Sequence, residues 1–328
     1  MKRVLVTGAT GFTGGYLCRC LISKGYEVRG LSLPGMNTNT LEKEGVRIFR
    51  GDLTRKETLT EAVRDVDIIY HIAAVYREEN VPKKIFWAVN CEGTKNLLEV
   101  AEKAKIKRFV HCSTVGVQGE IRNPPASEEA PYNPGDYYQE SKMEGELAAL
   151  DFFRNRGLPG VVFRPVGIYG PGDARFLKLF RYIQNGKFRM FGSGEVLYHL
   201  TYIDDLINGI LLVGEKPDIE GEIFTLAGPV YTTLNELVET IANVLEVPVP
   251  KRHIPVWPVW MVGALCELLC RPFRIHPPIY RRRVDFFIKD RAFDIKKAKE
   301  KLGYNPRVDL FVGLKKTAEW YRKEKLLT

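Results

Sequence analysis

The chain has 328 residues, of which 45% are hydrophobic and 27% are charged, and its formal net charge is +9. This balance is typical of a globular chain with one large or two smaller lobes, and it excludes a disordered or fibrous protein. Six cysteines are too few for a secreted disulfide framework, no cysteine spacing indicates zinc, and the apolar stretch at the N-terminus is too short for a signal peptide, so we expect a cytoplasmic protein with reduced thiols and no metal.

The first half of the chain alternates between two hydrophobic periods. Short runs rich in β-branched residues predict strands, and the amphipathic stretches between them predict helices. Strands that alternate with helices form right-handed crossovers, which give a mostly parallel sheet covered on both faces. The predicted fold is therefore α/β, with a Rossmann-type doubly wound sheet. The predicted strands are 3–7, 27–32, 46–50, 67–72, 108–112 and 160–163, and the predicted helices are 14–24, 56–64, 94–104 and 142–156.

A glycine-rich loop follows the first predicted strand and opens the first helix. Gly8 permits a tight turn, Gly11 lets the backbone approach a pyrophosphate, and Gly14 lets the helix pack on the strand. Free N–H groups at the positive end of that helix favour the negative charge of the pyrophosphate. The loop residues expected to bind NAD or NADP are Gly8, Gly11, Phe12, Thr13 and Gly14.

The type of dinucleotide is decided by the end of the second strand. An acid there binds the ribose 2′-hydroxyl of NAD, whereas an Arg accommodates the extra phosphate of NADP. Residues 31–34 are Leu-Ser-Leu-Pro, so neither signal is present and both dinucleotides stay open.

The fifth strand, 108–112, runs into Ser113 and Thr114. Their hydroxyls are therefore expected at the carboxyl end of a sheet strand, where α/β sheets bind ligands. We expect Thr114 to hydrogen-bond the oxygen of a substrate, with Ser113 as the reserve. The alternative for Thr114 is a structural cap at the strand end.

Tyr138 and Lys142 are four residues apart, so they lie one above the other on a helix face. A nearby ammonium stabilises a phenolate and lowers its pKa from about 10, which makes Tyr138 a candidate acid and base. The ammonium can also hold the ribose hydroxyls of a cofactor. Tyr321 and Lys325 have the same spacing, but Tyr321 lies on the predicted C-terminal surface helix, far in sequence from the glycine loop.

Beyond about residue 164 the alternation loosens, which predicts a smaller, mostly helical C-terminal substrate lobe. We expect a dinucleotide-binding domain at residues 1–165, with 200–228 returning to it, and a substrate lobe at 166–199 and 229–328. The predicted elements of this half are helices at 204–215, 233–245 and 309–324 and a strand at 221–227.

Residues 254–270 form a nearly uninterrupted apolar segment that includes Trp257 and Trp260. Two prolines near its start and Glu267 inside leave it short of the roughly 20 apolar residues that span a bilayer. The segment is either a buried helix of the smaller lobe or an apolar cap or interfacial anchor for a hydrophobic substrate.

These features together resemble the extended short-chain dehydrogenases/reductases, also called the NAD-dependent epimerase/dehydratase family, over essentially the whole chain. The segments that carry the resemblance, besides the glycine loop and Tyr138/Lys142, are 51–53, 71–74, 89–94, 164–171 and 202–206. The resemblance implies an adenine contact at the first of these segments and an active-site Asn in the third. The residues that it adds to the cofactor or active site are Asp52, Leu53, Ala73, Ala74, Asn90, Pro165 and Ile168.

Departures from the family pattern narrow the implied reaction. Dehydratases of the family carry an Asp-Glu pair where this chain has Val115 and Gly116, neither of which exchanges a proton, so dehydration is not expected. Its epimerases usually have Asn and Arg where this chain has Gly167 and Tyr198, and loss of the Arg removes a charge-assisted donor to a nucleotide diphosphate. The basic run at 281–283 keeps an epimerase open as an alternative. With dehydratases and epimerases less favoured, the pattern of this chain is similar to the branch of 3β-hydroxysteroid dehydrogenases and dihydroflavonol reductases.

The expected activity is hydride transfer between NAD or NADP and a hydrophobic secondary alcohol or its ketone. The alternatives are a UDP-sugar epimerase with tightly bound NAD and a dinucleotide sensor, although sensors tend to lack the Tyr or the Lys. The expected partners are a small-molecule substrate and a second copy of the chain. No groove-reading motif accompanies the basic residues, so no specific nucleic-acid binding is expected, and a peripheral membrane contact stays open.

Overall fold

A computed structural model describes residues 2–76, 81–270 and 285–327. Its centre is a seven-stranded sheet in which every neighbouring pair of strands is parallel, in the order β10-β6-β5-β4-β1-β2-β3. The predicted α/β fold is confirmed. The strands of this sheet are β1 (Arg3–Thr7), β2 (Glu27–Ser32), β3 (Arg47–Arg50), β4 (Ile68–His71), β5 (Arg108–Cys112), β6 (Gly160–Pro165) and β10 (Ile223–Leu226).

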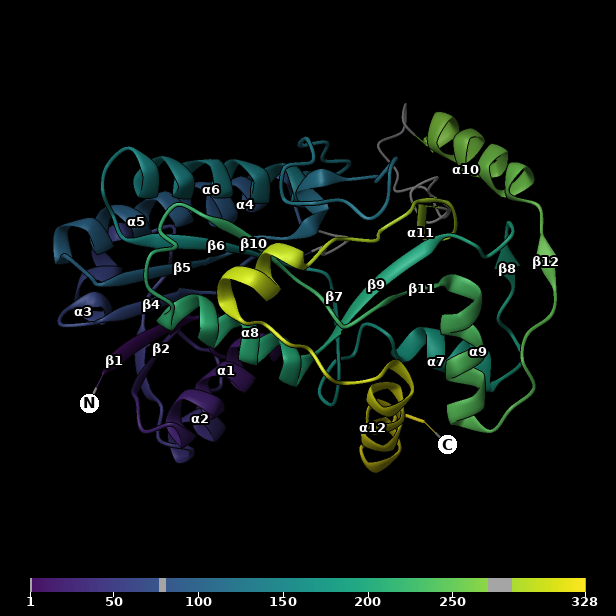
Figure 1. Cartoon of the computed structure of the whole chain (residues 1–328), viewed down its shortest axis with the longest axis horizontal. Helices are drawn as coiled ribbons and strands as arrows, with labels where there is room; N and C mark the ends of the chain where they lie inside the picture. Colours follow the sequence, from purple (N-terminus) through teal and green to yellow (C-terminus); the bar gives the residue numbers. More distant parts are fainter. Residues whose placement is uncertain (1, 77–80, 271–284, 328) are drawn as a thin grey trace.

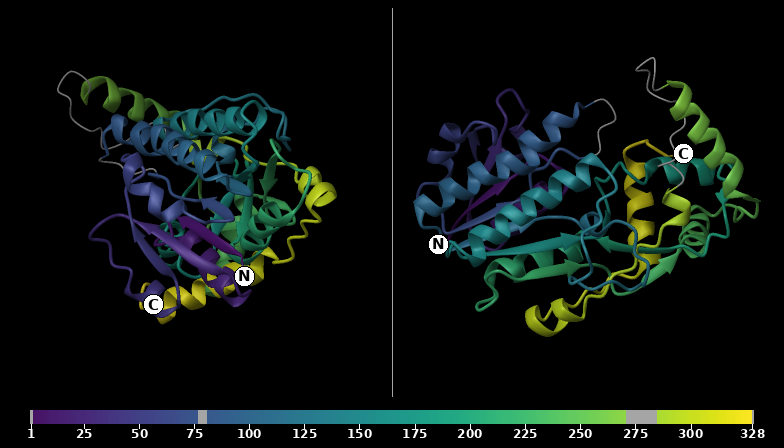
Figure 2. Two further views of the ribbon diagram at one scale, coloured as in Figure 1. Left: turned by 90° about the vertical axis from the view of Figure 1, so that its left-hand side faces the viewer. Right: turned by 90° about the horizontal axis from the view of Figure 1, so that it is seen from above.

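Helices cover both faces of this sheet, because alternate strand residues point to opposite sides. In β1, Val4 and Val6 face a core shared with α1 and α8, whereas Leu5 faces a core shared with α5 and α6. Figures 1 and 2 show α5 and α6 on one side of the sheet and α1 and α8 on the other. The helical elements around the sheet are α1 (Phe12–Ser23), α2 (Asn39–Lys43), η1 (Lys56–Leu59), α3 (Thr60–Val63), α4 (Lys83–Phe86), η2 (Trp87–Glu92), α5 (Gly93–Ala104), η3 (Val115–Gln118), α6 (Tyr137–Arg154) and α8 (Ile203–Glu215).

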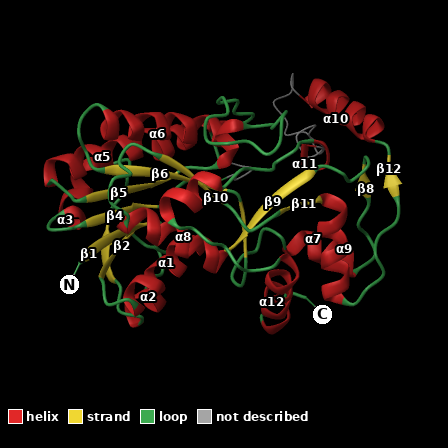
Figure 3. Cartoon of the chain, viewed as in Figure 1, coloured by secondary structure: helices red, strands yellow, loops and turns green. Residues whose placement is uncertain are grey.

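The second half of the chain adds a smaller layer beside the carboxyl ends of β5 and β6 (Figure 3). It contains strands as well as the expected helices: a three-stranded sheet in the order β11-β9-β7 and a two-stranded pair, β8 and β12. Residues 200–202 belong to β9 of this smaller sheet, so the return to the large sheet begins with α8. These elements are β7 (Gly167–Tyr169), α7 (Leu177–Gln184), β8 (Met190–Phe191), β9 (Leu197–Tyr202), β11 (Tyr231–Thr233), α9 (Leu234–Leu245), β12 (His253–Ile254), α10 (Val256–Cys270), α11 (Asp285–Ile288), η5 (Ala298–Leu302) and α12 (Leu310–Lys323).

The structure contradicts the interpretation of the apolar segment as a buried helix. The helix α10 lies at the periphery of the molecule (Figure 1), with 66% of Trp257, 57% of Met261 and 59% of Leu269 exposed. An apolar sequence predicts that a helix needs an apolar partner, but it does not specify that the partner lies in the same chain. No helix in the described part of the chain is long and apolar enough to cross a membrane. The basic run at 281–283 lies outside the described residues.

Candidate active site

The glycine loop joins β1 to α1 at the carboxyl edge of the sheet. Gly8 has a φ of +70°, and a Cβ there would lie 2.8 Å from the Cα of Ala73, at the end of β4. A Cβ on Gly14 would lie 2.1 Å from the carbonyl oxygen of Gly8, so the first turn of α1 packs directly on the loop. Gly11 is the N-cap of α1 and has no side chain with which to satisfy the first N–H groups of the helix. The loop therefore keeps backbone donors available to an anion at the positive end of α1.

A cavity of about 970 Å³ lies over this loop. It brings together the glycine loop, the ends of β2 and β3, the end of β4 and the segment after β6, which come from distant parts of the sequence. All of the residues predicted to hold the dinucleotide line it: Gly8, Gly11, Phe12, Thr13, Gly14, Asp52, Leu53, Ala73, Ala74, Tyr138, Lys142, Pro165 and Ile168. A cleft with such a glycine cradle fits a dinucleotide, whereas no group of acidic, His or Cys side chains in the described residues could hold a metal ion.

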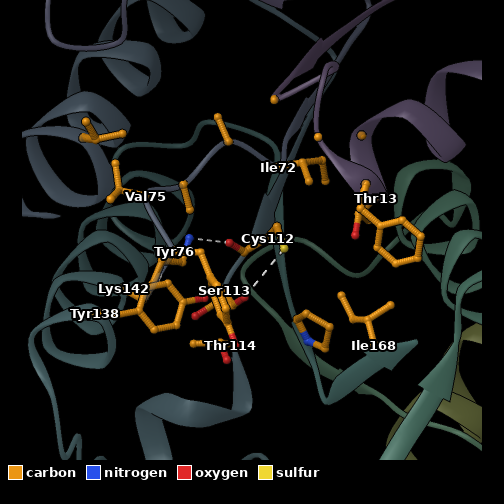
Figure 4. A pocket seen from close by; sticks show the side chains of 18 of the residues that line it. Thr13, Ile72, Val75, Tyr76, Cys112, Ser113, Thr114, Tyr138, Lys142 and Ile168 are labelled. Atoms are coloured by element: carbon orange, nitrogen blue, oxygen red, sulfur yellow. Dashed lines mark hydrogen bonds between the residues drawn. The ribbon is translucent and has the colours of Figure 1, made fainter. Parts of the chain in front are cut away.

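Tyr138 and Lys142 enter this cavity from α6. The helix begins at Tyr137, five residues before the predicted start, because Asp136 caps it by accepting a hydrogen bond from the N–H of Gln139 at 2.8 Å. Tyr138 therefore lies in the first turn and Lys142 one turn later, on the same face. Figure 4 shows both side chains on the side of the pocket where Ser113 and Thr114 lie.

Lys142 is 2% exposed, and its Nζ donates to the carbonyl oxygen of Cys112, at the end of β5, over 2.6 Å. Burial lowers the pKa of Lys142, because the charged form loses its hydration. A cation removed from bulk water acts more strongly on its neighbours than a solvated one. The carbonyl of Cys112 thus holds the buried amine of Lys142 at the cavity wall, on the same face of α6 as Tyr138.

The two hydroxyls after β5 have different surroundings. The Oγ1 of Thr114 accepts a hydrogen bond from the N–H of Gly116 at 3.1 Å and caps η3, so the structural alternative for this residue is real. That bond uses an oxygen lone pair and leaves the hydroxyl proton of Thr114 for a ligand in the cavity. Ser113 is buried, and its Oγ has no hydrogen-bond partner among the described residues. Both side chains line the cavity.

The structure does not bring Asn90, expected among the catalytic residues, to the cavity wall. Asn90 is 1% exposed, accepts from the N–H of Val75 at 2.8 Å, and donates to the carbonyl of Val75 and to Ser141, each at 3.0 Å. These bonds tie the segment after β4 to α6. These bonds use both N–H groups of the amide and one lone pair of its oxygen, so Asn90 joins two walls of the cavity, and its catalytic role stays a prediction.

A buried ion pair fixes α6 against β6, and the sequence analysis missed it. The guanidinium of Arg164 lies 2.5 Å from Glu146, and the two side chains are 1% and 0% exposed. Tyr132 donates to the same carboxylate at 2.7 Å. Glu146 stands one helical turn beyond Lys142, so this pair sets the depth of α6 against the sheet. No local pattern reports such a pairing, because its partners are 18 residues apart on different elements.

The segment after β7 is fastened to α1 and to α12. Tyr16 donates to the carbonyl of Pro171 at 2.8 Å, and Tyr321 donates to that of Asp173 at 2.7 Å. Tyr321, expected on a surface helix, is fully buried and is thus part of this fastening rather than a second candidate acid.

A second chamber of about 490 Å³ adjoins the cofactor cavity. Both share wall residues such as Tyr76, Val166, Ile168 and Arg291, so they form one continuous cleft. The second chamber is walled by the smaller layer, including Phe286 of α11. A ligand in the second chamber would reach the wall that this chamber shares with the first cavity.

The chain is similar to several known proteins. The model of the NAD dependent epimerase/dehydratase family matches residues 4–227. The chain is 28% identical to human sterol-4-alpha-carboxylate 3-dehydrogenase, decarboxylating, over 98% of this chain and 88% of that protein. Among solved structures, gox2253 superposes with a TM-score of 0.87 at 27% identity, covering 100% of both chains. The UDP-glucuronic acid 4-epimerase of Bacillus cereus, in complex with NAD, superposes with a TM-score of 0.78 at 26% identity, covering 98% of this chain and 99% of that one.

Proposed function

Because the chain belongs to the NAD dependent epimerase/dehydratase family, we propose that it is an oxidoreductase that transfers a hydride between NAD and a hydrophobic secondary alcohol or its ketone. The observation that carries this proposal is the convergence of the glycine loop, Thr114, Tyr138 and Lys142 on one cavity that continues into a second chamber. The substrate would lie in that chamber, whose wall includes Phe176, Leu179, Leu200, Phe286 and Phe293.

The roles of the residues follow from their positions. When bound, the nicotinamide supplies the acceptor or donor of the hydride. Tyr138 would take the proton of the substrate hydroxyl during oxidation and return it during reduction. The buried ammonium of Lys142, held by the carbonyl of Cys112, would stabilise the phenolate and hold the ribose. Thr114 would donate its hydroxyl proton to the substrate oxygen and so orient the carbinol carbon.

NAD is the dinucleotide that we infer. The family whose model matches the chain is NAD dependent. The solved B. cereus relative has NAD bound. Titration of the purified protein with NAD and with NADP tests the inference, and tighter binding of NADP would contradict it.

A UDP-sugar epimerase is the second candidate, supported by the similarity to the B. cereus UDP-glucuronic acid 4-epimerase. The same Thr, Tyr and Lys would serve an epimerase, in which a sugar hydroxyl is oxidised with NAD as the hydride acceptor and the keto form is reduced again by the NADH formed, without net redox change. A dehydratase has less support, because Val115 and Gly116 offer no proton-exchanging group beside Thr114.

Two assays on one preparation separate these functions. A change of NADH absorbance that depends on a steroid ketone supports the oxidoreductase. Interconversion of UDP-glucose and UDP-galactose without a net change of NADH, together with no response to the ketone, would overturn it in favour of the epimerase. Dinucleotide binding with neither activity would leave a sensor and would overturn both.

Assembly, location and surface contacts are finer parts of this proposal. Free cysteines among the described residues are in keeping with a reducing, cytoplasmic environment. The exposed Tyr137 and Leu147 of α6 support a homodimer through this helix, and light scattering measures the oligomeric state.

The exposed Trp257 and Met261 of α10 support a peripheral contact with lipid. Sedimentation with phosphatidylglycerol vesicles, compared between the native protein and Trp257→Ser, tests that contact.

A further inference from the structure

The second chamber is lined by three cationic side chains among the described residues, Arg175, Lys289 and Arg291. Two of them have carboxylate partners: Arg175 lies 2.5 Å from Asp173, and Lys289 lies 2.9 Å from Asp285. Arg291 differs, because no described carboxylate lies within salt-bridge distance of its guanidinium, and its hydrogen bonds go to neutral groups. Within the described part of the chain, the charge of Arg291 is therefore uncompensated.

Neutral groups hold Arg291 in place. Its backbone N–H donates to the carbonyl of Leu197 at 2.8 Å, and its carbonyl accepts from the N–H of His199 at 2.9 Å, which ties it to β9. Its side chain donates to the hydroxyl of Tyr198 at 2.7 Å and to the carbonyl of Asp285 at 3.2 Å. A guanidinium carries five N–H donors. These contacts orient the group and leave donors over for a ligand.

The position of Arg291 points to the substrate as the missing partner. It is half-buried and lines both the cofactor cavity and the second chamber, so it stands where the two meet. Apolar side chains such as Phe286, Phe293 and Leu200 share that wall. A partly buried charge is usually paired, since its lost hydration must be offset. Three described carboxylates also line the chamber: Asp285 pairs with Lys289, Asp136 caps α6, and Glu120 is exposed, so water screens its charge.

We propose that the substrate carries a carboxylate and that Arg291 binds it. This inference rests on the proposed function and narrows its substrate class to an apolar alcohol or ketone with one acidic group. A single guanidinium matches a single carboxylate in charge and in fork geometry. A nucleotide diphosphate brings at least two charges, whereas Arg175 and Lys289 already have acidic partners. Tyr198 stands where epimerases of the family usually have an Arg, and it orients the guanidinium that comes from Arg291 instead.

The test measures binding rather than turnover, so it does not depend on the redox assay. The probes are benzoate, naphthoate and biphenylcarboxylate, each paired with its methyl ester and titrated calorimetrically into the NAD-saturated protein. UDP serves as a diphosphate probe. The variants are Arg291→Leu and Arg291→Lys. The matched control is Arg189→Leu, because Arg189 is likewise half-buried and bonded to carbonyl oxygens, but it lines neither cavity.

At least one acid is expected to bind tenfold or more tightly than its ester to the native protein. Arg291→Leu should remove that difference while leaving the affinity for the ester and for NAD within threefold. Arg291→Lys should retain part of the difference in affinity between acid and ester, and Arg189→Leu should retain all of that difference. The proposal is overturned if no acid binds better than its ester, if Arg291→Leu weakens NAD instead, or if UDP binds through Arg291 more tightly than every acid. Absence of hydride transfer alongside the expected acid preference would reject the proposed function and leave this anion site standing.

Discussion

The substitution Gly14→Ala offers a stringent test of the glycine loop. The new Cβ would lie 2.1 Å from the carbonyl oxygen and 2.7 Å from the carbonyl carbon of Gly8, and both are backbone atoms that cannot rotate away. Relief requires a shift of about 1 Å between α1 and the loop, and overpacking of this kind costs about 1–3 kcal/mol. The gain in helix propensity from Gly to Ala returns only about 1 kcal/mol.

The neighbouring glycine provides the matched control. A Cβ on Gly15 would find the carbonyl oxygen of Ala9 at 3.5 Å as its nearest neighbour, an ordinary contact, so Gly15→Ala should be neutral or stabilising by up to about 1 kcal/mol. Urea unfolding and calorimetric titration with NAD measure both variants. Gly14→Ala should bind NAD at least tenfold more weakly, because the first turn of α1 moves, whereas Gly15→Ala should bind it normally. Equal NAD affinity in the two variants would refute the claim that this packing shapes the dinucleotide site.

Two further predictions concern buried ionisable groups. Glu146→Gln leaves the charge of Arg164 buried without a carboxylate partner and should lower the free energy of unfolding in urea by about 3–5 kcal/mol. Adding Arg164→Met should recover most of this loss. A double variant as unstable as the single one would contradict this reasoning. His111 is fully buried, neither of its ring nitrogens has a hydrogen-bond partner among the described residues, and burial lowers its pKa well below 6.5. Below pH 6.5 the unfolded chain therefore binds a proton that the folded protein does not bind. As the pH is lowered, the free energy of unfolding decreases by up to about 1.4 kcal/mol per pH unit for each such histidine. His111→Leu should flatten this fall between about pH 6.5 and 4.5 without abolishing it, since burial also lowers the pKa of His71 to about 3; an unchanged pH profile would count against it.

Much of the large sheet could be predicted from the sequence because its signals are local. The strands β1, β2 and β5 begin and end at the predicted residues, since each is a short segment with buried apolar residues that is bounded by turn or helix residues. The start of α6 was predicted five residues late, although Asp136, three residues before Gln139, carries the local signal of an N-cap.

What could not be predicted depends on contacts between distant segments. Asn90 was recognised from a pattern, but only the fold places its amide on Val75 and Ser141, away from the cavity. The pairing of Arg164 with Glu146 joins a strand to a helix, and the isolation of the Arg291 charge depends on which acids pair elsewhere. Composition specified that α10 is apolar but not that it stays exposed.

The central claim is that Tyr138 transfers the substrate proton in a dinucleotide-dependent reaction. Tyr138→Phe removes only the phenolic oxygen, so the most direct measurement is single-turnover hydride transfer by this variant next to its affinity for NAD. The account predicts a loss of at least a hundredfold in rate with unchanged NAD affinity. Hydride transfer at the native rate would contradict it.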